Sequence, residues 1–243
     1  MGGKVDAYLD IASLYSYIAF CHIVKNQELL TAHGVHVDIH PILLGAVNAA
    51  SGNKPPWTLP AKAEYGNFDA RRASARVGKP GITAPDGFME RSMTVLPLRA
   101  LHFIKANYPG AVYLTAWHWL LHRFWEPPNA DLTKPDVLAA ALADAPRQYP
   151  GGGDAGDRLF GDADVGRIME GAAAQEVKAS VKAKTQEAIG RGAFGAPWFW
   201  VVDDAGKGEP FFGSDRFHFM YDYLGVPYQD VAILPPQSKG AKL

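Results

Sequence analysis

The segment that decides the fold spans residues 4–39 and reads KVDAYLDIASLYSYIAFCHIVKNQELLTAHGVHVDI. Its first part, Val5–Leu9, alternates and is rich in residues that favour strands, and a turn follows. Leu14–Leu30 has the apolar spacing of a long helix, which Gly34 ends. Val35–Ile39 alternates again and predicts a second strand. A β-α-β unit of this kind indicates parallel strand pairing in an α/β protein.

The middle of the chain is expected to be almost entirely helical. Ser51–Pro60 is rich in Pro and Gly, so we predict an exposed loop there. Beyond this loop, apolar residues recur at helical spacing from Ala61 to Trp125. A further helix is expected over Val165–Ile189.

Strand signals return after a glycine-rich break near residue 190. We predict strands at Trp198–Val202 and Pro210–Phe212, joined by a turn. Ser214 or Asp215 is expected to cap a last helix over Arg216–Leu224.

The element order is therefore β-α-β, a helical block, then β-β-α. This order describes a thioredoxin-like fold that carries an all-helical insertion. We predict a thioredoxin-like domain from residues 1–60 and 188–243, with the insertion at 61–187.

The composition of the chain excludes several kinds of reactive site. The chain has 243 residues, a formal net charge of -1 and a single cysteine, Cys21. One cysteine excludes an intramolecular disulfide, a CxxC redox centre and a thiolate-rich metal site. The near-zero charge gives no electrostatic reason to expect nucleic acid or an anionic membrane as a partner. Since the sequence has no suitable ligand cluster, we predict no metal.

The two ends of the sequence carry the features that bear on where the protein is located in the cell. No apolar run reaches the length of a membrane span, and no secretory signal begins the sequence, so we expect a soluble intracellular protein. The last three residues, Ala241-Lys242-Leu243, are a conservative variant of the Ser-Lys-Leu peroxisomal signal. This tripeptide predicts import into peroxisomes through the import receptor. If the tripeptide is not used as a signal, we expect a cytoplasmic or mitochondrial location. The alternative is a terminus without function.

Ser13 is the first candidate for chemistry. It lies where the first strand meets its helix, beside unpaired backbone N–H groups and the positive end of the helix dipole. Such a place stabilises an anion. The alternative is that Ser13 serves only as a helix cap.

Two further candidates lie in the last quarter of the chain. Ala196-Pro197 immediately precedes a predicted strand, where a cis bond would expose the backbone of Ala196 to an extended peptide. Ser214 and Asp215 could bind a carboxylate and an ammonium group. A trans bond and a plain helix cap are the respective alternatives.

A fourth candidate is the stiff loop Ser51–Pro56, SGNKPP, whose amide and ammonium suit an anionic ligand. Other features favour structural roles. His118 and His122 have the spacing of a helical metal pair but lack the glutamate of the HExxH motif. Cys21 lies within the first helix and is expected to be a small packed side chain.

Together, four motifs resemble the kappa class of glutathione transferases. They are Ser13-x-Tyr15-Ser16, SGNKPP, GAFG-x-P at residues 192–197 and FGSDR at residues 212–216. The resemblance covers most of the chain and implies a DsbA-like helical insertion, a homodimer and glutathione as cosubstrate. In the family a Ser-Pro-Tyr-Ser tetrapeptide usually stands where disulfide oxidoreductases have Cys-x-x-Cys. Here Leu14 replaces that Pro.

The resemblance also implies roles for individual residues. Ser13 would donate its hydroxyl to the glutathione sulfur and so stabilise the thiolate. The expected glutathione-binding residues are Asn53, Pro55, Lys62, Ala196, Pro197, Ser214 and Asp215. A small hydrophobic electrophile would meet a wall formed by Tyr15, Tyr17 and Trp57.

Three functions fit these features. The leading hypothesis is conjugation of glutathione with soft electrophiles, as in detoxification, together with glutathione peroxidase activity. The second is the activity of a related enzyme, glutathione-dependent 2-hydroxychromene-2-carboxylate isomerase. Residues 69–73 resemble the sequence of that isomerase. The third is a binding module or chaperone that recognises extended peptides beside Pro197. Only the third requires no thiol activation.

Overall fold

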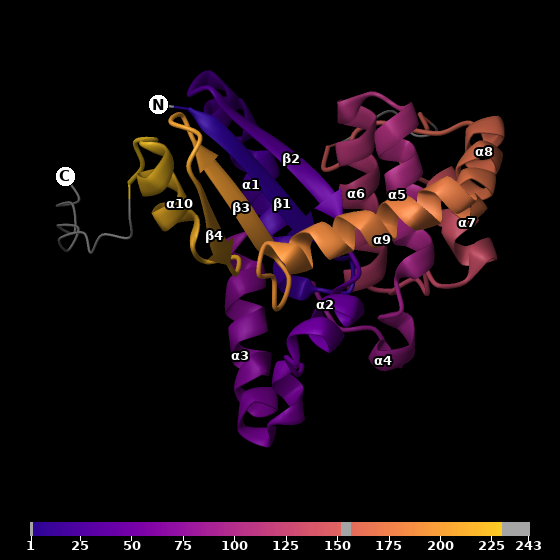
Figure 1. Ribbon diagram of the computed structural model, residues 1–243. Helices are drawn as coiled ribbons and strands as arrows, with labels where there is room; N and C mark the ends of the chain where they lie inside the picture. The colour runs from indigo at the N-terminus through magenta and orange to yellow at the C-terminus, as the bar shows by residue number, and fades with distance from the viewer. Residues whose placement is uncertain (1, 152–156, 230–243) are drawn as a thin grey trace, which may run out of the picture.

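The computed structural model describes residues 2–151 and 157–229 (Figure 1). In this part of the chain a mixed sheet has the strand order β2-β1-β3-β4. The strands are β1 (Gly3–Leu9), β2 (Val35–Pro41), β3 (Trp198–Asp203) and β4 (Gly208–Phe212). β1 pairs in parallel with β2 and antiparallel with β3, which pairs antiparallel with β4. The predicted α/β fold with a helical insertion is confirmed.

Helix α1 (Leu14–Ala32) connects the two parallel strands. Its buried side chains include Tyr17, Phe20 and Ile23, which pack in the main core. After the helix, Gly34 adopts a left-handed φ of 71° and leads into β2. The sequence therefore predicted both the helix and the residue that ends it.

Between β2 and β3 the described chain is helical apart from its connections. α9 runs from the helical insertion back to the sheet (Figure 1). The elements are α2 (Leu44–Ser51), the short 3-10 helix η1 (Pro56–Thr58), α3 (Pro60–Arg76), α4 (Phe88–Arg91), α5 (Val95–Asn107), α6 (Gly110–Trp125), α7 (Pro135–Ala143), α8 (Asp162–Ala173) and α9 (Gln175–Gly190).

The helix predicted over Val165–Ile189 is wrong in one respect, because the structure divides it at Ala174. Ala174 has an extended ψ of 147° and is the boundary residue of both α8 and α9. Three consecutive alanines favour helix, so local propensity gives no sign of this break. Packing of α8 against α5 accompanies the change of direction.

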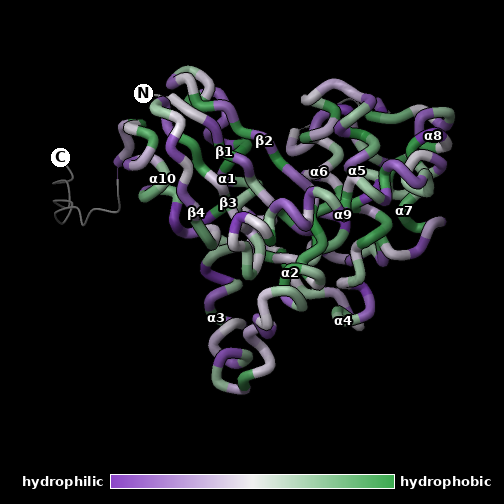
Figure 2. Tube along the Cα trace, in the orientation of Figure 1, coloured by the Kyte–Doolittle hydropathy of each residue, from purple (hydrophilic) through white to green (hydrophobic). Residues whose placement is uncertain are grey.

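The main hydrophobic core is continuous from the sheet into the helical insertion. Phe20, Leu101, Trp117 and Phe199 belong to it and are fully buried. A smaller cluster packs around Tyr8, Ile42 and Trp198, near the carboxyl end of β1. Figure 2 shows that α3, by contrast, is largely hydrophilic. In the described part of the chain, no helix combines the length and hydrophobicity needed to cross a membrane.

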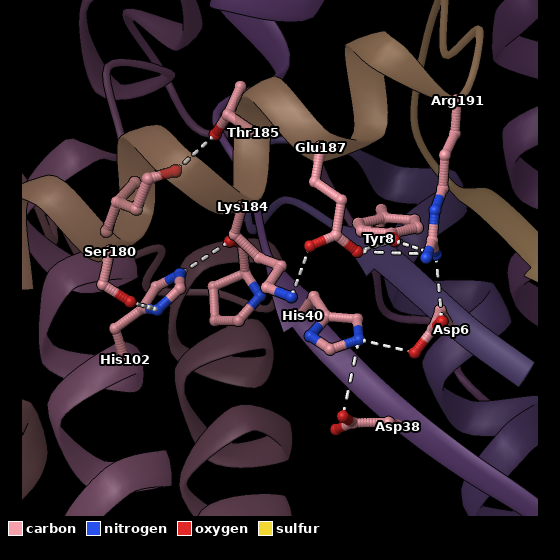
Figure 3. Close-up of polar contacts among 12 residues, drawn as sticks. Asp6, Tyr8, Asp38, His40, His102, Ser180, Lys184, Thr185, Glu187 and Arg191 are labelled. Atoms are coloured by element: carbon pink, nitrogen blue, oxygen red, sulfur yellow. Dashed lines mark hydrogen bonds and ion pairs between the residues drawn. The ribbon is translucent and has the colours of Figure 1, made fainter.

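A polar network joins the sheet to α9 (Figure 3). Asp6 of β1 accepts from His40 at 2.9 Å and from Arg191 at 2.9 Å, and Arg191 also donates to Tyr8 at 2.5 Å. Burial opposes ionisation of Asp6, but hydrogen bonds from His40, Lys4 and Arg191 hold its pKa well below the usual range. The network therefore fixes the end of α9 against β1.

Candidate active site

The site is built on the turn between β1 and α1. Ser13 is the N-cap of α1, with an extended φ of -101°, and its Oγ accepts a hydrogen bond from the Ser16 N–H at 3.1 Å. The Ser13 hydroxyl donates to the carbonyl of Ala196 at 2.9 Å. Ser13 thus caps the helix, as expected, and also reaches a residue 183 positions along the chain.

Asp10 lies beneath this turn and is completely buried. Its Oδ1 accepts from the Ala12 N–H at 3.0 Å and from the Thr94 hydroxyl at 2.6 Å, while Oδ2 accepts from the Leu44 N–H at 2.6 Å. Burial raises its pKa to about 6, although these hydrogen bonds favour the ionised form. Asp10 therefore ties the Ser13 turn to the first residue of α2 and to the N-cap of α5. From the sequence alone, Asp10 is predicted only to begin a turn.

The segment Phe194–Pro197 gathers several of the predicted site residues around Ser13. The Asn53 side chain donates to the Phe194 carbonyl at 2.7 Å. The Ala196–Pro197 peptide bond is cis, and the Pro197 carbonyl accepts from the Gly213 N–H at 3.2 Å. The structure thus links the loop of Asn53, the start of α1 and the turn before Ser214.

Ser214 and Asp215 follow Gly213, which has a left-handed φ of 97°. Asp215 is exposed and forms an ion pair with Arg216. The predicted cap of the last helix, α10 (Phe217–Leu224), is wrong: Arg216 occupies the N-cap position, and no side chain caps the helix. The side chains of Ser214 and Asp215 therefore do not cap α10.

The two other predicted glutathione-binding residues, Pro55 and Lys62, do not take part in the hydrogen bonds described above around Ser13. Pro55 is half-buried, and its carbonyl accepts from the Thr58 hydroxyl at 2.8 Å. Lys62 is exposed near the start of α3.

The three aromatic candidates have different surroundings. Trp57 is 46% exposed and packs edge-on against Phe88. The Tyr15 hydroxyl donates to Asp69, and burial together with this carboxylate raises the pKa of Tyr15. Tyr17 is fully buried, with its hydroxyl 2.8 Å from Glu126, so the structure does not bring it to the surface at Ser13. The expectation that Tyr17 forms part of the apolar wall for the electrophile is therefore wrong, because its position on α1 points the side chain into the core.

Cys21 is separate from this site. Cys21 is partly buried, and its Sγ lies 3.8 Å from Nε2 of His118, between α1 and α6. Burial raises the pKa of Cys21 to about 12 and lowers that of His118 to about 3, so both groups are neutral near pH 7. The packed role expected for Cys21 agrees with this environment.

One group of potential metal ligands occurs among the described residues, formed by Asp6, Asp38 and His40. Protein cations already neutralise its carboxylates. Lys105 Nζ is 2.5 Å from Asp38, and Lys4 Nζ is 2.8 Å from Asp6. This arrangement suits an ion-pair network better than a metal centre.

At Ser13 the chemistry that the geometry supports is stabilisation of an anion. A hydroxyl, the first turn of a 19-residue helix and the backbone of Ala196 meet at one place. The fold and this site define a thioredoxin-fold protein of the DsbA-like type, with a serine at the start of α1. In agreement, the DSBA-like thioredoxin domain family matches residues 158–225.

Sequence relatives identify the family within this type. The chain is 30% identical over 231 residues to glutathione S-transferase kappa 1 of Caenorhabditis elegans, covering 92% of each chain. It is 28% identical to glutathione S-transferase kappa 1 of Homo sapiens, covering 96% of this chain and 94% of the human one. The chain therefore belongs to the kappa class of glutathione S-transferases, which confirms the resemblance found in its motifs.

A solved structure of 2-hydroxychromene-2-carboxylate isomerase is also similar. The TM-score is 0.68 at 18% identity, with 91% of this chain and 94% of the isomerase covered. At this identity the similarity supports the shared fold.

Proposed function

We propose that this protein is a glutathione transferase in which Ser13 stabilises the glutathione thiolate for attack on soft electrophilic carbon. The observation that carries the proposal is the Ser13 hydroxyl, held at the N-terminus of α1 and 2.9 Å from the Ala196 carbonyl. When glutathione binds, this hydroxyl turns from the carbonyl to the sulfur. The thiol proton leaves to solvent, and the thiolate forms a carbon–sulfur bond as the electrophile releases its leaving group.

The energies are sufficient for this role. A free thiol has a pKa of about 8.5, and lowering it by about two units requires about 2.7 kcal/mol. A hydrogen bond to a charged group contributes about 1.5–3 kcal/mol, and a helix N-terminus adds about 0.3–1 kcal/mol. Ser13 and α1 can therefore make the bound thiol mostly ionised near neutral pH. A serine cannot form a mixed disulfide, so the thiolate stays available for conjugation.

We place the remaining parts of glutathione along the residues that meet around Phe194–Pro197. The backbone of Ala196 would pair with the cysteinyl residue, and Ser214 with Asp215 would bind the γ-glutamyl end. Asn53 and Pro55 would line the same site. Lys62, which is exposed near the start of α3, would reach the glycyl carboxylate. Tyr15 and Trp57 would contact the electrophile.

The experiment that tests the function measures glutathione binding, then turnover with a chloronitrobenzene acceptor and with a hydroxychromene carboxylic acid. Conjugation of the chloronitrobenzene supports the transferase. Turnover of the chromene alone would favour the isomerase, which the fold similarity and residues 69–73 support. Absence of glutathione binding would contradict both activities and favour a peptide-binding module beside Pro197.

Replacing Asp215 by Ala is expected to weaken glutathione binding about tenfold or more, because the γ-glutamyl ammonium loses a carboxylate partner. The pKa of the bound thiol should stay the same, since Asp215 does not contact the sulfur in this arrangement. Calorimetry gives the affinity, and ultraviolet absorbance of the thiolate gives the pKa. Asp222→Ala, on the following helix, is the matched control. A large change in thiol pKa with Asp215→Ala would contradict the division of roles.

Peroxidase activity, the homodimer and the peroxisomal location stay predictions. Ala241-Lys242-Leu243 lies outside the described residues. Reduction of a lipid hydroperoxide, sedimentation of the full chain and imaging after deletion of Leu243 test the three in turn.

A further inference from the structure

Asp10 and Ser13 belong to one hydrogen-bonded turn at the start of α1. The Ser13 N–H donates to the Asp10 carbonyl at 3.1 Å. The Asp10 N–H donates to the Ser16 Oγ at 3.4 Å, and the Ser16 N–H donates to the Ser13 Oγ at 3.1 Å. The carboxyl group of Asp10 is therefore held in the same turn as the place proposed for the thiolate.

The Asp10 carboxyl is completely buried, and neutral groups supply its hydrogen bonds. The donors include the N–H groups of Ala12 and Leu44 and the hydroxyl of Thr94. No ion pair joins Asp10 to another residue that the structure describes. Burial raises the pKa of Asp10 to about 6, so the carboxyl is mostly ionised at pH 7 and takes up a proton just below it. Because a buried charge is little screened, it acts strongly on ions nearby.

Few other titratable groups lie on the helices that contact this turn. α2 carries no titratable side chain. The titratable side chains nearest in sequence to the contacts with the turn are Tyr15 of α1, Arg99 of α5 and Glu126 at the end of α6. Tyr15 donates to Asp69, Glu126 pairs with Lys79, and none of the three bonds to the Asp10 carboxyl. Asp10 is therefore the ionisable group of the turn itself.

The protonated carboxyl also has a hydrogen-bond partner at this position. The Thr94 hydroxyl, 2.6 Å from Oδ1 of Asp10, can accept from the acid as well as donate to the carboxylate. The Ser92 carbonyl lies 3.4 Å from the same hydroxyl and accepts its proton when the hydroxyl turns. Both charge states of Asp10 are therefore hydrogen-bonded, and the group can change its protonation in the folded protein.

We propose that the charge of Asp10 opposes the thiolate at Ser13, so that Asp10 takes up a proton when bound glutathione ionises. The inference rests on the proposed function and adds a second ionisable group to it. Both anions draw on the positive end of α1, because the Ala12 N–H at that end already donates to Asp10. In this step the thiol S–H bond breaks and its proton goes to solvent, while the Asp10 carboxylate takes a proton from solvent. One negative charge is then left at the turn.

The test compares the protons released with the thiolate formed when glutathione binds to the full chain at about pH 6.5, just above the pKa of Asp10. Calorimetry in buffers of different ionisation enthalpy counts the protons, and ultraviolet absorbance measures the thiolate. S-methylglutathione, which cannot ionise at sulfur, gives the contribution of all other groups. We expect the native protein to release about half a proton less than the thiolate that it forms, because a rise of about one unit in the pKa of Asp10 takes up that amount.

Asp10→Asn provides a second measurement. Removing the charge should lower the pKa of the bound thiol by about one unit, and the protons released should then equal the thiolate formed. Damage to the turn would have the opposite effect, because loss of the Ser13 contact raises the pKa of the thiol. Asp86→Asn, at an exposed position, is the matched control and should change neither quantity. Circular dichroism verifies that each variant is folded, and the proton balance of the native protein decides without the variant if Asp10→Asn does not fold.

Two outcomes would overturn the role of Asp10. One is equality of released protons and thiolate in the native protein after the S-methylglutathione correction. The other is an unchanged or raised thiol pKa in folded Asp10→Asn. A depressed thiol pKa that depends on Ser13 but not on Asp10 would leave the transferase in place and remove only this inference. A failure of the proposed function looks different, because glutathione would not bind or its bound thiol would keep the pKa of free glutathione, and that result contradicts both.

Discussion

Ser13→Ala is expected to lower kcat/KM for conjugation by roughly 10- to 150-fold near neutral pH, which corresponds to loss of one hydrogen bond to a charged sulfur. The physical reason is that the thiol becomes less ionised when the hydroxyl is absent. Steady-state kinetics at fixed pH measures the change. At a pH well above the thiol pKa the defect should shrink, because the thiolate then forms without help.

Two controls separate this effect from damage to the fold. Thr31→Ala removes an exposed hydroxyl at the opposite end of α1, where it bonds to the Gln27 carbonyl, so the activity of this variant should be nearly unchanged. Ser13→Ala also removes a helix cap, which costs about 1 kcal/mol of stability, so the thermal midpoint should be recorded. Full activity of a folded Ser13→Ala protein would mean that another group stabilises the thiolate.

Replacing Asp10 by Asn is expected to change how stability depends on pH. The pKa of an aspartate carboxyl is ordinarily 3.8, and burial raises that of Asp10 to about 6 in the folded state. Between these values the folded protein retains a proton that the unfolded chain has released. Asp10 therefore makes the native protein lose stability as pH rises from about 4 to about 6, by about 3 kcal/mol in total.

Urea unfolding at several pH values measures this contribution. The free energy of unfolding of the native protein, relative to Asp10→Asn, should fall by about 3 kcal/mol across that window. The variant is also expected to be destabilised at every pH, because an amide N–H would face the Leu44 N–H. Asp86→Asn, at an exposed position, is the control. A pH-independent difference would contradict the raised pKa of Asp10.

Local sequence signals predicted much of the framework. Alternation identified β1 and β2, and helical spacing with a glycine stop identified α1. Ser13 was found because a hydroxyl residue at a strand-to-helix junction is a strong local signal for a cap. The sequence does not specify a cis peptide bond before Pro197, because most X–Pro peptide bonds are trans.

Other features depend on contacts between distant residues. Asp10 looks like an ordinary turn residue until Thr94 and Leu44 approach it from two other helices. The break at Ala174 runs against local propensity and accompanies packing of α8 on α5.

The pKa of the glutathione thiol bound to the protein tests the role of Ser13 most directly. Thiolate absorbance of the binary complex can be followed against pH for the native protein and for Ser13→Ala. We expect a pKa about two units below that of free glutathione in the native complex, and a value higher by about one to two units in the variant. The same depressed pKa in both proteins would contradict thiolate stabilisation by Ser13.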